Sequence, residues 1–182
     1  MNNQILRNTQ TALFVALLVV VQAATMPMGS TIVTGSAVNL LLILSVMLCG
    51  LPSGLTVAVM SPIIARFFGI GLLWGIIPFI ILGNIALVLA WHLIGNQSKI
   101  RRLFAYSAAL AAAALIKFAV LYVGIVKIAI PLFLNLPEQQ AMVISGMFSV
   151  PQLITAGIGG LAAAAVLPAL NHILKVSRHD YT

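Results

Sequence analysis

A few polar side chains interrupt long apolar stretches of this 182-residue sequence, and they are the residues best able to do chemistry. The candidate binding residues among them are two cations and three amides, namely Asn39, Arg66, Asn84, Lys117 and Gln152. Cationic and amide groups hydrogen-bond to carboxylates, carbonyls and hydroxyls. Their placement therefore favours the binding of a small polar molecule.

Lys117 carries the strongest signal, because it lies at least about 15 Å from either end of its apolar stretch at about 1.5 Å per helical residue. A lysine at that depth in a membrane costs roughly 2.5–3.5 kcal/mol on insertion scales, and its side chain cannot easily reach water. Both acidic residues, Glu138 and Asp180, lie outside the apolar stretches. We expect Lys117 to contact an anionic ligand, with helix-end carbonyls or water as the alternative.

The other four polar residues each have a second interpretation. Arg66 lies at the end of its stretch, where it could instead reach outer lipid headgroups. Asn84 follows a glycine and lies six residues after a proline, a context that frees backbone carbonyls, yet it could simply bond another helix. Gln152 and Asn39 lie at the expected outer starts of their helices and could serve as caps or packing residues.

These side chains must be positioned by membrane-spanning helices. Hydrophobic residues make up 62% of the chain and charged residues only 6%, which is too few to cover a surface that faces water. Apolar runs broken by charge, proline and glycine predict an all-α integral membrane protein with one domain, residues 1–182. The six expected helices are about 9–26, 36–50, 53–68, 71–94, 103–127 and 147–174.

The distribution of lysine and arginine predicts that both termini are cytoplasmic. With the N-terminus inside, six of the nine basic residues fall on the cytoplasmic side: Arg7, Lys99, Arg101, Arg102, Lys175 and Arg178. The net charge of +7 forms no extended basic stripe, so we expect no nucleic-acid partner. Trp74 and Trp91, near opposite ends of the fourth helix, are expected to be interfacial anchors.

The sequence also argues against several function classes. No acid lies inside a span to couple ion flow, and no phosphate-binding loop of the Walker type is present to hold ATP. His92 and His172 have no acidic partner within a helical turn, His179 and its neighbour Asp180 lie in the C-terminal tail, and Cys49 is the single cysteine. We therefore expect a protein that is not an enzyme, with no cofactor and no metal site.

Helix one carries a face of small residues. Ala12 and Ala16 are four positions apart and Ala23 follows eleven positions after Ala12, so the three share one side of the helix. Small residues at this spacing allow close approach of another helix. The face could dock a partner subunit, or pack inside the protein itself.

The chain has six expected spans, cytoplasmic termini, no energy source of its own, an Ala12-x-x-x-Ala16 motif and a long outer loop before helix six. In these features and in its length it resembles the substrate-binding S component of an energy-coupling factor (ECF) vitamin transporter. The resemblance implies the six-helix S-component fold in a prokaryotic plasma membrane. It also implies a transmembrane coupling subunit and two cytosolic ATPases as partners, with the alanine face of helix one as the docking surface. Members of this family bind vitamins in an outward cavity near helices four to six and the first outer loop, and they topple in the membrane during transport.

Within that family, the low aromatic content of 7% and the central lysine favour a flexible carboxylate over a ring-shaped vitamin. Pantothenate is the best candidate, with its carboxylate on Lys117 or Arg66 and its amide and hydroxyls on Asn84 and Gln152. A pyrimidine or a pyridoxine-like precursor is the second choice. A stand-alone small transporter or channel, and a non-transporting membrane scaffold, are the other classes that remain.

Overall fold

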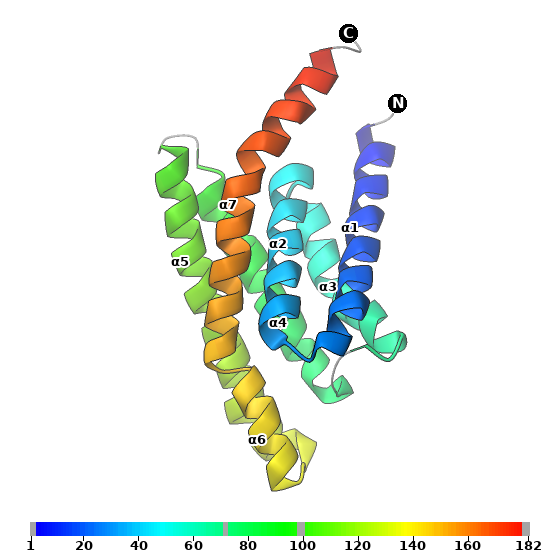
Figure 1. Cartoon of the computed structure of the whole chain (residues 1–182), viewed down its shortest axis with the longest axis vertical. Helices are drawn as coiled ribbons and strands as arrows, with labels where there is room; N and C mark the ends of the chain where they lie inside the picture. The colour runs from blue at the N-terminus through cyan, green and yellow to red at the C-terminus, as the bar shows by residue number, and fades with distance from the viewer. Residues whose placement is uncertain (1–2, 71–72, 98–100, 180–182) are drawn as a thin grey trace.

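The computed structural model describes residues 3–70, 73–97 and 101–179, and within these ranges the chain forms helices joined by short connections (Figure 1). The α-helices are α1 (Asn3–Thr25), α2 (Thr31–Cys49), α3 (Leu51–Phe67), α4 (Ile77–Ala90), α5 (Arg102–Leu121), α6 (Glu138–Met147) and α7 (Val150–His179). A wider, π-helical winding continues α4 over Trp91–Gly95 and α5 over Tyr122–Leu134. The all-α prediction is confirmed.

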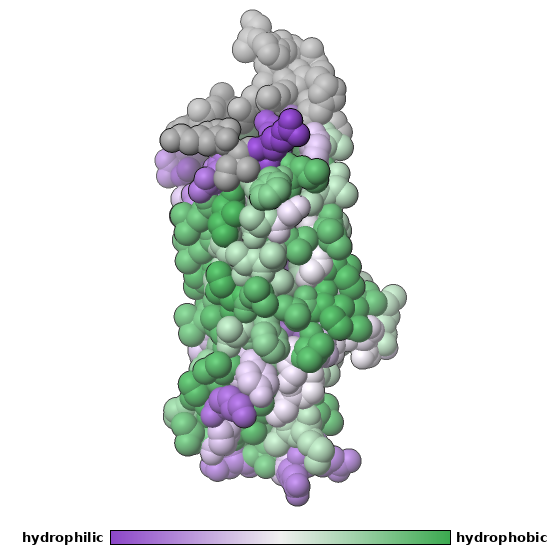
Figure 2. Space-filling view, turned by 90° about the vertical axis from the view of Figure 1, so that its left-hand side faces the viewer, coloured by the Kyte–Doolittle hydropathy of each residue, from purple (hydrophilic) through white to green (hydrophobic). Residues whose placement is uncertain are grey.

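Five helical stretches are long and apolar enough to cross a membrane: Gln4–Met28, Thr31–Cys49, Trp74–Gly95, Arg102–Leu134 and Glu138–Asn171. The helix Leu51–Phe67 is apolar but shorter. A broad hydrophobic surface lies between hydrophilic patches at the two ends of the molecule, as expected for a protein embedded in lipid (Figure 2). The start of α1 and the end of α7 lie at the same end of the bundle (Figure 1).

Several helix boundaries differ from those expected. The first helix begins at Asn3 rather than near residue 9, because polar residues at a helix end can remain helical outside the apolar span. The second begins at Thr31 rather than 36, since the Ser30 hydroxyl accepts the Val33 N–H at 3.4 Å and caps the helix. Asn39 is therefore inside α2 and not at its start.

The fourth expected helix, 71–94, begins later, and its residues 71–72 lie outside the described part of the chain. A single turn over Trp74–Ile76 leads into α4. Pro78 lies in the first turn of α4, where backbone N–H groups have no partner within the helix, so the N–H that proline lacks is not needed.

The expected outer loop between helices five and six is largely helical. Helix five, expected to end near 127, continues to Leu134 in the wider winding that accommodates Pro131. The short helix α6 occupies most of the rest, and α7 begins at Val150 rather than 147. The proline and amide residues of this segment therefore coincide with short interruptions between helices and not with a long irregular loop.

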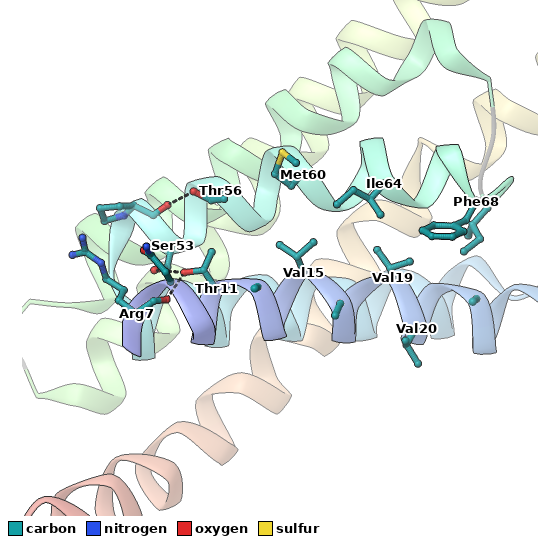
Figure 3. Close-up of a pocket in the computed structure, with 16 residues that line it drawn as sticks. Arg7, Thr11, Val15, Val19, Val20, Ser53, Thr56, Met60, Ile64 and Phe68 are labelled. Carbon is teal, nitrogen blue, oxygen red and sulfur yellow. Dashed lines mark hydrogen bonds between the residues drawn. The ribbon is translucent and has the colours of Figure 1, made fainter. Parts of the chain in front are cut away.

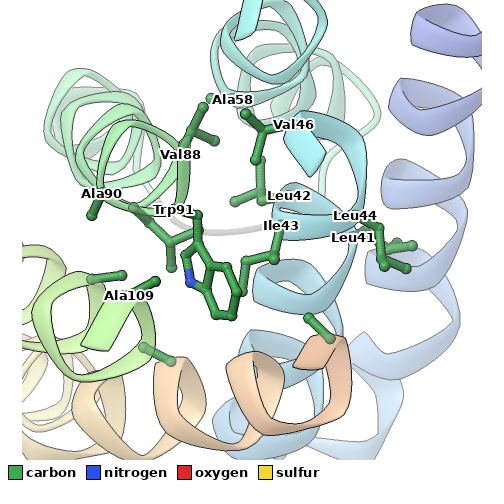
Figure 4. Packing of buried hydrophobic residues seen from close by; sticks show 14 of the residues in the cluster. Leu41, Leu42, Ile43, Leu44, Val46, Ala58, Val88, Ala90, Trp91 and Ala109 are labelled. Atoms are coloured by element: carbon green, nitrogen blue, oxygen red, sulfur yellow. The ribbon is translucent and has the colours of Figure 1, made fainter. Parts of the chain in front are cut away.

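The main hydrophobic core lies where α2, α4, α5 and α7 meet, with α1 at the edge of the bundle (Figures 1 and 4). Trp91 is 1% exposed and packs with Leu42, Ile43 and Val88 of this cluster. The prediction that Trp91 is an interfacial anchor is therefore wrong: its side chain points inward, and the bulky ring fills the space between helices. Trp74 is half exposed.

The helices α2 and α7 make the most extensive contact in the bundle, and glycine permits it. A methyl group at Gly159 would lie 2.6 Å from the carbonyl oxygen of Ser36 and 2.7 Å from Cβ of Asn39. A methyl group at Gly35 would lie 2.8 Å from the Thr155 side chain. The two backbones therefore approach closely enough to bring Asn39 against Thr155.

Candidate ligand-binding site

Lys117 lies at the centre of a buried polar cluster contributed by three helices. Its ammonium donates to Oδ1 of Asn39 at 2.6 Å and to Oδ1 of Asn84 at 2.8 Å. Lys117 is 4% exposed, Asn39 1% and Asn84 2%. An ammonium has three N–H donors, so one remains for another partner.

The cluster continues into α7 through a chain of hydrogen bonds. Asn39 Nδ2 donates to Thr155 Oγ1 at 3.3 Å, and that hydroxyl donates to the Gln152 carbonyl at 3.1 Å. The Gln152 side chain in turn donates to the carbonyl of Met147 at 3.0 Å. These bonds hold Asn39 at both ends of its amide and fix the position of the lysine.

The two asparagines therefore differ in what they can offer a ligand. Each turns its oxygen toward Lys117, so each NH₂ group points away from the ammonium. The NH₂ of Asn39 is bonded to Thr155, whereas that of Asn84 has no partner among the described residues. Within this cluster, the NH₂ of Asn84 and the free N–H of Lys117 are donors available to recognise an anion.

These residues form one wall of a cavity of about 330 Å³. The cavity extends from the polar cluster to the α1–α2 connection, which contributes Gly29 and Ser30, at the end of the bundle opposite the start of α1 (Figure 1). Met147 and Phe148, where α6 meets α7, border it as well. Its remaining lining includes Gln22, Thr31, Thr34, Val38, Ser61, Pro62, Ala65, Ile77, Ile80, Leu121 and Gln152.

Of the five residues expected at the site, four line this cavity: Asn39, Asn84, Lys117 and Gln152. Arg66 does not: its guanidinium lies over the ring of Trp74, 5.7 Å from the centroid. Its position in the last turn of α3 places it within reach of this aromatic ring.

Thr155 of the hydrogen-bond network and Ser61 of the cavity wall are among the polar residues absent from the expected set. Thr155 lies three residues after Gln152, a helical spacing that places both on one face and could have indicated it. Ser61 lies in the cavity wall on α3, and its type gives no comparable signal, because serine is common in membrane helices.

The small residues of α1 line a second hollow, a groove of about 1020 Å³ between α1 and α3 (Figure 3). Ala12, Ala16 and Ala23 are all exposed along it. At one end the Ser53 hydroxyl donates to Thr11 Oγ1 at 2.8 Å and joins the two helices, because the Thr11 hydroxyl itself donates to the Arg7 carbonyl; the rest of the groove is mainly apolar. The alanine face is thus open and does not pack inside this chain.

The arrangement at Lys117 can bind an anion. Its charge faces only neutral amide groups within the cluster, so an anionic ligand would supply the missing counter-charge. Within the described residues no three of His, Cys, Asp or Glu come together in a group that could hold a metal ion. The chain matches no protein-family model, no curated protein and no solved structure.

Proposed function

We propose that this protein is the substrate-binding membrane subunit of an ECF-type importer for a small water-soluble vitamin that carries a carboxylate. The observation that supports it most is the buried ammonium of Lys117 beside a cavity within a bundle of membrane-spanning helices. Pantothenate is the best candidate.

The carboxylate of the ligand accepts the remaining N–H of Lys117 and the free NH₂ of Asn84. These two donors come from two helices, and a carboxylate has two oxygens that can accept from both. A ligand with a single neutral acceptor would match the pair of donors less well. Asn39 acts as a positioning residue, because its amide is already bonded to Lys117 and Thr155.

The size and lining of the cavity support a small, flexible ligand. Its volume of about 330 Å³ is near the lower end of the roughly 300–1,000 Å³ usual for small-molecule sites. Phe148 is its single aromatic lining residue among those described, so it offers little surface for stacking a ring. A pyrimidine or pyridoxine-like ligand is accordingly the weaker candidate.

The groove between α1 and α3 is the proposed docking surface for the transmembrane coupling subunit. Exposed alanines with a mainly apolar lining allow a partner helix to approach closely. Two cytosolic ATPases would provide the energy, since the sequence contains no phosphate-binding loop of its own. The protein should accordingly co-purify with a coupling subunit and ATPases from its native membrane.

The ligand is tested by calorimetric titration of purified protein with pantothenate and with its neutral alcohol analogue. A charge-assisted hydrogen bond contributes about 1.5–3 kcal/mol, so Lys117→Met should weaken pantothenate binding roughly ten- to a hundredfold. Binding of the alcohol should change far less. Lys127→Met is the matched control, because Lys127 is exposed on the continuation of α5 and lies over the Tyr122 ring.

Thermal unfolding of the empty Lys117→Met protein must accompany the titration. The substitution removes the donor from two buried amide oxygens, of Asn39 and Asn84, while it also removes a buried charge. A variant that stays folded and binds pantothenate as tightly as the wild type would exclude Lys117 as the carboxylate partner.

A further inference from the structure

Ser61 has a buried hydroxyl that the fold leaves unpaired. The residue is 0% exposed, and Oγ has no hydrogen-bond partner among the described residues. Five other helical hydroxyls donate to the carbonyl four residues earlier: those of Thr9, Thr11, Thr25, Thr56 and Ser107. Ser61 does not make the corresponding bond to Val57.

Ser61 belongs to the wall of the central cavity. The α3 residues that line the cavity are Ser61, Pro62 and Ala65, so the serine is the one polar residue that this helix contributes. The cation and the free amide NH₂ come from other helices, α5 and α4. The cavity therefore has a second polar position besides the anion-binding one.

An unpaired buried hydroxyl is unfavourable, and buried polar groups in proteins are nearly always bonded. A group of the ligand that can both donate and accept would satisfy Ser61. A hydroxyl group has both capacities.

Building on the proposed function, we infer that Ser61 is a specificity-determining residue that contacts a hydroxyl of the ligand, so that the site selects a hydroxylated carboxylate over a purely aliphatic one. Lys117 and Asn84 recognise the charged end, and Ser61 recognises the polar group of the tail. A simple short-chain fatty acid would satisfy the first contact and leave the second unmade.

The test compares pantothenate with the analogue that lacks both of its hydroxyl groups, by calorimetric titration of wild type, Ser61→Ala and Ser36→Ala. Ser36 provides the matched control, because its Oγ is also buried and unpaired but the residue does not line the cavity. Ser61→Ala should weaken pantothenate binding about three- to tenfold, the factor of one neutral hydrogen bond, and leave the deoxy analogue unaffected. Ser36→Ala should change neither affinity.

Each outcome decides between the possibilities. The inference is wrong, while the proposed function stands, if Ser61→Ala binds pantothenate as tightly as the wild type does. The same holds if the substitution weakens the binding of pantothenate and of the deoxy analogue by the same factor. If the wild type binds neither acid, the carboxylate ligand itself is wrong, and the inference fails with it. Thermal unfolding of the empty variants is a separate check: both should be at least as stable as the wild type, and a clear loss at Ser61 would reveal a structural partner for its hydroxyl instead.

Discussion

The close contact of α2 and α7 can be tested by one methyl group. In Gly159→Ala the new carbon would lie 2.6 Å from the Ser36 carbonyl oxygen, 2.7 Å from Asn39 Cβ and 3.0 Å from the Leu40 amide nitrogen. These atoms are backbone or Cβ, so no side-chain rotation can move them away. The two helices must separate locally until the contacts approach the 3.4 Å at which ordinary van der Waals contact begins.

This separation should affect both stability and the binding site. Overpacking of this kind costs about 1–3 kcal/mol, offset in part by the roughly 1 kcal/mol that alanine gains over glycine within a helix. At about 2–4 °C per kcal/mol for a chain of this length, the melting temperature should fall by a few degrees. The Asn39–Thr155 bond, already 3.3 Å long, would be stretched beyond a useful length, and Asn39 would hold Lys117 less firmly.

Gly157→Ala is the matched control, because Gly157 lies two residues earlier in the same helix and a methyl group there meets nothing within 4 Å. Thermal unfolding in detergent should show Gly157→Ala unchanged or slightly stabilised and Gly159→Ala destabilised, with weaker pantothenate binding only in the latter. A Gly159→Ala protein at least as stable as Gly157→Ala would refute the tight packing of α2 on α7.

Two further predictions concern orientation and coupling. In a Cys49→Ser background, a membrane-impermeant thiol reagent added to intact cells should label Gln139→Cys and leave Gln97→Cys unlabelled. Both positions are exposed, but they belong to opposite sides of the membrane in the proposed topology. The reverse labelling pattern would overturn the orientation. Ala16→Trp should fill part of the α1–α3 groove, abolish vitamin uptake and co-purification, and leave ligand binding by the isolated protein intact. Leu13→Trp, at a 65% exposed position outside the groove, should affect neither, and a loss of binding in Ala16→Trp equal to its loss of uptake would contradict a docking role.

The sequence alone predicts an all-helical membrane protein, because the length and apolarity of each run are local properties. They determine whether a segment can cross the bilayer, and a segment inside the bilayer must satisfy its own backbone hydrogen bonds as a helix. It also identifies Lys117, since a cation far from any acid within an apolar run demands a partner whatever the fold. The face shared by Ala12, Ala16 and Ala23 follows from helical periodicity in the same way.

Partners across the bundle depended on the tertiary structure. Lys117 bonds residues 78 and 33 positions away in the chain, and no helical period encodes such pairs. The packing of α2 on α7 at Gly35 and Gly159 is what brings Asn39 and Thr155 together. For that reason Asn39, which the sequence placed at a helix start as a possible cap, is instead proposed as a positioning residue for Lys117.

The direction in which a side chain points from its helix likewise determined its surroundings, which composition alone could not predict. Trp91 points into the core although its place near a helix end suggested an anchor, and Arg66 turns to Trp74 although its charge suggested the binding site. Exposure depends on which neighbours surround each face, and these neighbours are fixed only when all the helices pack. The unpaired hydroxyl of Ser61 is visible for the same reason, because an absent partner can be recognised only once every candidate partner has a position.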